Sequence, residues 1–173
     1  MNSSFQNNLT SVRFQSFQHN QAVELGYESL FAEKRVLVIS IPNIFGTRSP
    51  YQLRNFNAEL TSFHSMGIDE VYVVSSHTAI VAPWAQAHSL MLGLYDRGQF
   101  VKLVAEHFGI DKSEKLLKST WQYIILVKNG EPEKFWHNPV KENIKLEILR
   151  NPQYDFRRLS PDTVKAYLSD CVL

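Results

Sequence analysis

Apolar and polar positions along the chain follow strand-like and helix-like periods in turn. Residues 35–41 (RVLVISI) form a short apolar run rich in β-branched residues, which predicts a buried strand. A helix is predicted next, over residues 50–67, because apolar residues recur there at helical spacing until a glycine stops it. These apolar residues are Leu53, Phe56, Leu60 and Phe63, and the glycine is Gly67. Residues 69–76 (DEVYVVSS) predict a second buried strand.

The second half of the chain predicts two helices and then a hairpin. Residues 80–90 (IVAPWAQAHSL) favour a helix with a proline in its first turn, where a missing N–H costs little. Residues 96–109 (DRGQFVKLVAEHFG) predict a turn and then a helix that ends at the final glycine. Residues 121–138 alternate in polarity around Asn129 and Gly130, and this dipeptide is a strong signal for a tight hairpin turn.

A last helix is predicted over residues 160–173, with Ser160 as its N-cap and Pro161 as its first residue. The order strand–helix–strand–helix–helix–strand–strand–helix predicts a single α/β domain over residues 1–173. The strand–helix–strand passages imply parallel pairing and the hairpin adds antiparallel strands, so the sheet is expected to be mixed. Within this domain, residues 1–20 are expected to be a flexible or loosely packed N-terminal segment.

Composition and charge narrow the function classes. The chain has 173 residues, of which 44% are hydrophobic and 20% charged, as in a soluble globular domain. Its net charge of +1 gives no field that would attract nucleic acid. No apolar run approaches the roughly 18–20 residues that a membrane span needs. The N-terminal segment lacks the apolar core of a secretory signal and carries one arginine where a mitochondrial presequence has several. We therefore expect a cytoplasmic protein without nucleic-acid or membrane partners.

Four segments, in order along the chain, carry a resemblance to a known family. They are residues 30–45 (LFAEKRVLVISIPNIF), 67–88 (GIDEVYVVSSHTAIVAPWAQAH), 96–104 (DRGQFVKLV) and 122–135 (QYIILVKNGEPEKF). Together they resemble the peroxiredoxins of the type-five, redoxin-domain branch, and the likeness covers about residues 25–168. The resemblance implies a thioredoxin-like fold, with a central mixed sheet flanked by helices. It also implies a homodimer that packs the reactive-loop faces together.

The family's chemistry requires the motif PxxxTxxC, and this chain departs from it. In the family, a thiolate in the first turn of a helix attacks the peroxide O–O bond, and the helix N-terminus and an arginine lower the pKa of the thiol. Pro42 and Phe45 match the family's loop. Gly46 stands at the threonine position and Ser49 at the cysteine position, and Gln122 stands where the family has its arginine. The resemblance thus implies a redoxin domain that has lost thiol peroxidase activity and acts by binding or interaction.

The same loop leaves two alternatives open. The helix behind it is one residue short of the family spacing, so Arg48 takes the cysteine position if the deletion precedes it. Arg48 at a helix N-terminus would bind a small anion in the old peroxide pocket, together with Phe45, Ser49 and His77. Alternatively, Ser49 beside His77 would be an acyl-transfer nucleophile. This hydrolase is a remote alternative, because the chain has no GxSxG elbow and no evident acidic partner.

The cysteine and histidine content limits redox and metal chemistry. The chain has one cysteine, Cys171, which excludes an internal disulfide and a CxxC pair. A peroxidase that reduces hydroperoxides through Cys171 is the alternative to the binding function, although Cys171 is far in sequence from the loop. Six histidines are scattered without an HxH or HExxH spacing, so we expect neither a metal nor a cofactor.

Overall fold

The structure is a computed structural model that describes residues 3–41, 44, 48–76, 78–110, 122–137 and 159–171. Within these ranges, seven strands form one sheet in the order β2-β1-β5-β4-β3-β6-β7. The strands are β1 (Arg13–Gln18), β2 (Gln21–Gly26), β3 (Arg35–Ser40), β4 (Glu70–Ser75), β5 (Leu92–Tyr95), β6 (Tyr123–Lys128) and β7 (Glu131–His137). The helices are α1 (Ser3–Thr10), α2 (Tyr27–Phe31), α3 (Arg48–Ala58), α4 (Leu60–Ser65), α5 (Val81–His88), α6 (Gln99–His107) and α9 (Pro161–Asp170).

The middle of the sheet is parallel and its two sides are antiparallel. β3 pairs with β4, and β4 with β5, in parallel register. β6 runs antiparallel to β3, and β1 runs antiparallel to β5. The last residues of β3, β4 and β5 therefore lie at the same end of the sheet as the first residues of β6 and β1. We call this the carboxyl end of the sheet. The predicted mixed α/β architecture is confirmed.

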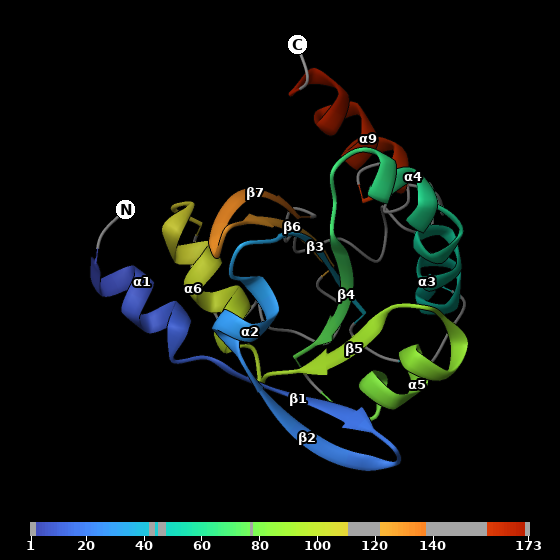
Figure 1. Cartoon of the computed structure of the whole chain (residues 1–173), viewed down its shortest axis with the longest axis horizontal. Coiled ribbons are helices and arrows are strands. Elements are labelled where there is room, and N and C mark those ends of the chain that lie inside the picture. Colours follow the sequence, from blue (N-terminus) through green and yellow to red (C-terminus); the bar gives the residue numbers. More distant parts are fainter. Residues whose placement is uncertain are drawn as a thin grey trace, which may run out of the picture.

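Side chains of β3 alternate between two hydrophobic clusters, one on each face of the sheet. Val36 and Val38 belong to the first cluster and Leu37 and Ile39 to the second, and all four are 0% exposed. The helices α1, α2 and α6 cover the first face, whereas α3, α4, α5 and α9 cover the second (Figure 1). A strand buried on both faces explains why residues 35–41 read as one continuous apolar run.

The N-terminal segment is folded, which corrects the expectation of a loose segment over residues 1–20. Residues 3–18 form α1 and β1, and Leu9, Val12 and Phe14 are at most 1% exposed. The ring of Phe14 lies 5.9 Å from that of Phe31 and 5.7 Å from that of Phe100. The sequence signal was weak because β1 alternates over only six residues, and its buried partners come from distant parts of the chain.

The long helix predicted over residues 50–67 is broken into α3 and α4. Glu59 has φ −103° and ψ 7°, and its N–H bonds to the Phe56 carbonyl three residues back. Phe56 and Phe63, one from each helix, stack at 5.9 Å and are both 0% exposed. The hydrophobic period continues through the break, so the pattern alone does not reveal it. Gly67 ends the segment at φ 89°, as predicted.

The sequence pattern did not predict β5, which has only four residues. Gly93 in this strand allows close packing, because a Cβ there would collide with the backbone of Ala82 in α5. β5 thus lies directly against α5 while it pairs with β4 on one side and with β1 on the other.

Two predicted local features are present. Asn129 and Gly130 both have positive φ, 53° and 78°, and join β6 to β7 as a tight hairpin. Ser160 caps α9, since its hydroxyl accepts a hydrogen bond from the Thr163 N–H at 3.4 Å. Among the described residues, no helix has both the length and the apolar character that crossing a bilayer requires.

Candidate functional site

Two residues that the sequence singled out lie toward the carboxyl end of the sheet. Ser49 lies in the first turn of α3 and is 3% exposed. Gln122 precedes β6 and is 8% exposed. The Ser40 hydroxyl, at the end of β3, accepts a hydrogen bond from the Tyr123 N–H at 2.8 Å. The start of β6 is therefore held against the point where the chain leaves β3 toward α3, which puts both residues at this end of the sheet.

Several predicted site residues are not placed by the structure. Pro42, Phe45, Gly46 and His77 lie outside the described residues. Arg48 is the first residue of α3, and only its backbone position is described. The predicted contact between Ser49 and His77 and the anion site at Arg48 therefore stay predictions.

Further polar residues at the same end of the sheet were not assigned a role from the sequence. The Ser76 hydroxyl, after β4, lies 3.4 Å from the Tyr123 hydroxyl on β6. Burial raises the pKa of the Tyr123 phenol strongly, and the negative charge of Asp96 raises it further. Asp96 follows β5, so groups from the ends of β4 and β5 both act on Tyr123 at the start of β6, through a contact with Ser76 and through the charge of Asp96. The signal for Ser76 and Asp96 was present, since each polar residue directly follows a buried strand.

Asp96 is a buried carboxyl group that caps α6. Its two oxygens accept hydrogen bonds from the N–H groups of Gly98, at 3.0 Å, and Phe100, at 2.8 Å. Burial raises the pKa of this carboxyl group, and the backbone hydrogen bonds oppose that shift only in part. The capping explains the position of Asp96 in the sequence, directly before the predicted helix.

These groups define what the site can do chemically. Ser40, Ser49, Ser76 and Gln122 offer hydroxyl and amide groups, and Tyr123 is a protonated phenol at neutral pH, since its pKa is raised above the already high value of an ordinary tyrosine. Such groups donate and accept hydrogen bonds, and none of them cycles through a sulfenic acid as a thiolate does. Within the described ranges, no cluster of three or more His, Cys, Asp or Glu residues could hold a metal ion.

The one cysteine lies away from this site. The amide of Gln52, one turn after Ser49, donates to the Leu159 carbonyl at 2.8 Å, just before α9 begins. Lys165 then pairs with Glu59 at 2.6 Å, so the middle of α9 lies beside the break between α3 and α4, and the C-terminal end of α9 points away from both helices (Figure 1). At a rise of 1.5 Å per residue, Cys171 lies about 15 Å along the helix axis from Pro161, the first residue of α9. Cys171 is exposed.

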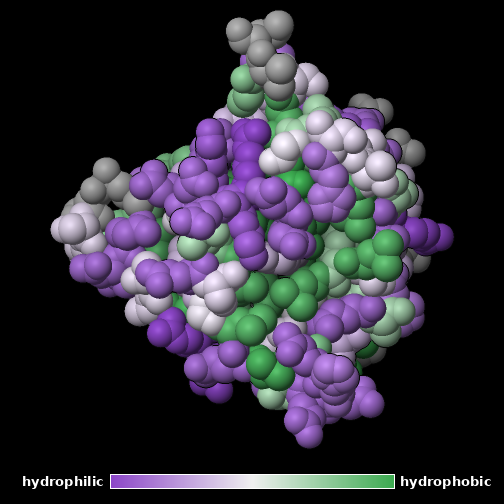
Figure 2. All heavy atoms as spheres, viewed as in Figure 1, coloured by the Kyte–Doolittle hydropathy of each residue, from purple (hydrophilic) through white to green (hydrophobic). Residues whose placement is uncertain are grey.

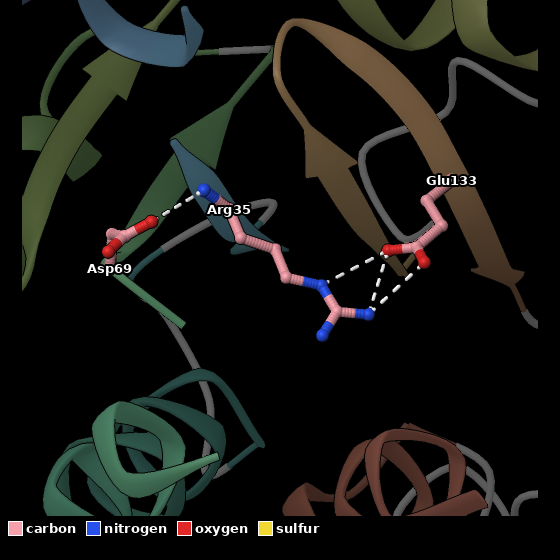
Figure 3. A network of polar contacts seen from close by, with 3 residues as sticks. All are labelled: Arg35, Asp69 and Glu133. Carbon is pink, nitrogen blue, oxygen red and sulfur yellow. Dashed lines mark hydrogen bonds and ion pairs between the residues drawn. The ribbon is translucent and has the colours of Figure 1, made fainter. Parts of the chain in front are cut away.

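The Arg35 ion pair belongs to the opposite end of the sheet. The Arg35 guanidinium contacts both carboxyl oxygens of Glu133 at 3.0–3.2 Å, and its backbone N–H bonds to Asp69 at 2.8 Å (Figure 3). Arg35 begins β3, so this cluster ties β3 to β7 and to the residue before β4. We assign it a structural role, because each of its three members bonds to another.

Comparison with known proteins agrees with this fold. No protein-family model matches the chain. Hybrid peroxiredoxin hyPrx5 of Haemophilus influenzae is 27% identical over 168 residues, which cover 91% of this chain and 63% of that protein. The chain is similar in sequence to a peroxiredoxin. This peroxiredoxin-like chain spans less than two thirds of the length of hyPrx5.

Solved structures with peroxiredoxin names also align with this peroxiredoxin-like chain. Reduced Prx3 of Vibrio vulnificus aligns with a TM-score of 0.62 and 17% identity, over 92% of this chain and 94% of that one. The Plasmodium falciparum antioxidant protein, a 1-Cys peroxiredoxin, aligns with a TM-score of 0.62 and 17% identity, over 96% and 91%. At such identities the likeness concerns the fold, and the predicted thioredoxin-like fold is confirmed.

Proposed function

We propose that this peroxiredoxin-like protein has lost thiol peroxidase activity and acts by binding at the carboxyl end of the sheet. One observation carries the proposal: the first turn of α3 holds Ser49, while the single cysteine lies at the end of α9. Peroxide reduction of the peroxiredoxin type needs a thiolate at a helix N-terminus, where the helix dipole favours the anion. A serine hydroxyl in that place does not form a sulfenic acid.

The ligand that we propose for this site is a small anion or another small polar molecule. Ser49 is buried in the first turn of α3, whose N-terminal amides favour negative charge. Arg48, as the first residue of this helix, would add a positive charge. Phe45 and Gln122 would complete the pocket, since they stand at positions that match the reactive loop and the arginine of the peroxiredoxins.

A peroxide-consumption assay tests the loss of activity. We expect the wild-type protein with a dithiol donor to consume hydrogen peroxide no faster than the donor alone. The Cys171→Ser variant should give the same background rate, since this exposed thiol is remote from α3. Rapid turnover that disappears on Cys171→Ser would instead support the alternative, a peroxidase acting through Cys171.

A gain-of-thiol variant provides the positive control. Ser49→Cys places a thiol in the first turn of α3, where we expect peroxide to convert it to a sulfenic acid that a dimedone probe traps. Wild type and Ser49→Ala should show no such adduct at this position. Labelling of wild-type Ser49 by a fluorophosphonate probe would contradict the binding function and support the hydrolase.

The proposed assembly is a homodimer through the face that α3 and α5 share. Tyr51 on α3 is 45% exposed, Ile80 before α5 is 54% exposed, and Leu90 after α5 is 88% exposed. The Leu90 N–H donates to the Asn57 side chain at 2.8 Å, which joins the segment after α5 to α3. Figure 2 shows hydrophobic side chains between hydrophilic ones in the middle of this view and on its right side, where α3 lies. A contiguous exposed apolar patch marks a surface that a partner covers, and we propose that these three side chains belong to one.

A further inference from the structure

A second polar hollow lies at the carboxyl end of the sheet, on the side of β1 and away from α3. Its volume is about 410 Å³, which is within the range of small-molecule pockets. β1 pairs with β5 only at Gln15 and Tyr95, among strands that are fully described. Beyond that pair β5 ends, and the chain turns toward α6 through Arg97 and Gly98, both with positive φ (Figure 1). The hollow is the space that this divergence opens.

The floor of the hollow is a row of three side chains across three strands. Glu24 on β2 is opposite Gln15 on β1, and Gln15 is opposite Tyr95 on β5. Side chains directly opposite in a sheet point to the same face, so these three share one face. Strands are spaced about 4.8 Å apart, which puts the backbones of Glu24 and Tyr95 about 10 Å from each other.

Charged groups of both signs line the hollow at its two sides. Arg13, Arg97 and Glu24 all line it and are exposed. Among the described residues, the Arg13 guanidinium bonds to protein atoms through Nη1, which donates to the carbonyls of Thr10 at 2.8 Å and Val12 at 3.1 Å. These bonds orient the guanidinium and leave its other donors for a ligand. No ion pair joins any of the three charged residues to another residue within the described ranges.

Arg97 has an unfavourable backbone conformation for its residue type. Its φ is 59°, in the left-handed region where glycine and asparagine are common, and a side chain with a Cβ costs about 1–2 kcal/mol there. Asp96, the residue before it, also lines the hollow, and its carboxyl oxygens already accept hydrogen bonds from the N–H groups of Gly98 and Phe100 at the start of α6. The local turn geometry would be satisfied by glycine at position 97, so the arginine is not needed for the turn itself.

We infer that this hollow binds a small zwitterion, an amino acid or a dipeptide, with its carboxylate on Arg97 and Arg13 and its ammonium group on Glu24. The two guanidinium groups supply planar donor pairs that match a carboxylate. A purely anionic ligand such as phosphate would be repelled by Glu24. A dipeptide is about 7 Å long, which fits the span from Glu24 to the turn after β5. The three charges are exposed to water, so we expect weak binding, with a dissociation constant on the order of 1 mM.

Titration of the ¹⁵N-labelled full chain with alanylalanine, followed by amide chemical shifts, tests this inference. We expect saturable shifts centred on Gln15, Tyr95 and Gln99. N-acetylalanine lacks the ammonium group and alaninamide lacks the carboxylate, so both should bind at least about fivefold more weakly. Inorganic phosphate should bind more weakly as well.

Three variants make the test specific. Arg97→Gly removes the guanidinium at a position whose φ suits glycine, so it should keep or raise the melting temperature and weaken alanylalanine binding about fivefold. Glu24→Gln should weaken the binding of alanylalanine, because the ammonium group loses its charged partner. The same substitution should strengthen the binding of phosphate, because the repulsion of the anion by Glu24 is removed. Arg54→Ala, an exposed arginine on α3, is the matched control and should change neither.

Three results would overturn the inference. One is the absence of saturable shifts with alanylalanine at tens of millimolar. Another is equal binding of alanylalanine, N-acetylalanine and phosphate. The third is binding that Arg97→Gly leaves unchanged. The readout is independent of the first turn of α3, so peroxidase activity or its absence does not affect the result.

Discussion

At the scale of single residues, Asp96 decides how β5 continues into α6. It is 4% exposed, and its carboxyl group satisfies the N–H groups of Gly98 and Phe100. We predict that Asp96→Ala lowers the free energy of unfolding by about 2 kcal/mol, because it removes a helix cap and leaves two buried N–H groups without a partner. Urea denaturation followed by circular dichroism measures this change. Asp170→Ala, an exposed acid on α9, should change stability little; a loss as small for Asp96→Ala would contradict the capping role.

Gly93 is the second residue whose identity the packing requires. A Cβ at this position would overlap the backbone of Ala82, so Gly93→Ala must push α5 away from β5. We expect a loss of about 3 kcal/mol or more, the cost of overpacking a rigid core. Gly26→Ala is the matched control, since its Cβ would come no closer than 4.0 Å to the Arg13 side chain. Equal melting temperatures for the two variants would show that α5 does not rest on β5 as described.

At the scale of elements, the ion pair between Glu59 and Lys165 joins α9 to the break between α3 and α4. The hydrogen bond from Lys165 lowers the pKa of Glu59 below its ordinary value of 4.5 in the folded state. A carboxyl group with a lowered folded pKa adds stability above its unfolded pKa and loses it as the pH falls through the folded pKa. We therefore predict that Glu59→Gln is less stable than wild type at neutral pH.

The difference between these two proteins should shrink in acid. Urea unfolding at a series of pH values, from neutral to about 3, measures it. The free energies of wild type and Glu59→Gln should converge once Glu59 is protonated in both folded and unfolded chains. A difference that stays constant over this range would show that the ion pair does not account for it. The same series on Lys165→Met should follow Glu59→Gln, because either substitution removes the pair.

At the scale of the whole molecule, the exposed apolar residues beside α3 and α5 make the assembly testable. We predict that the wild-type protein sediments as a dimer at micromolar concentration. Tyr51→Ser combined with Leu90→Ser should shift it toward the monomer, since these residues are 45% and 88% exposed in the single chain. Phe108→Ser, a 39% exposed residue after α6 on the other layer, is the control and should leave the dimer intact. A monomeric wild type would contradict the proposed assembly.

The local elements could be predicted where the signal lies within a few neighbouring residues. β3 and β4 are apolar runs buried on both faces, the hairpin turn is an Asn-Gly pair, and Ser160 caps α9 within three residues of itself. β1 and β5 could not be predicted in the same way. β5 has four residues, and β1 gains its stability from Phe31 and Phe100, which lie far from it in the sequence. Their strand conformation is a result of tertiary packing.

The candidate site divides along the same line. Ser49 and Gln122 were assigned through the resemblance to the peroxiredoxins, as the positions of the family's cysteine and arginine, and the presence of a single cysteine far from them was enough to question peroxidase chemistry. The contact of Ser76 with Tyr123 and the effect of Asp96 on Tyr123 were not foreseen, because these residues belong to different strands.

The sequence by itself determined which chemical groups this protein carries, including the single thiol of Cys171, and which helices and strands have strong local signals. Only the tertiary structure decided which of those groups are neighbours. The order of strands in the sheet places β1 beside β5 and β6 beside β3, although about 75 residues or more separate the members of each pair. Which residues are neighbours across a sheet depends on the strand order, and hydrophobic periods and capping residues do not encode that order. The hollow between Glu24 and Arg97 therefore has no signature in the local sequence pattern.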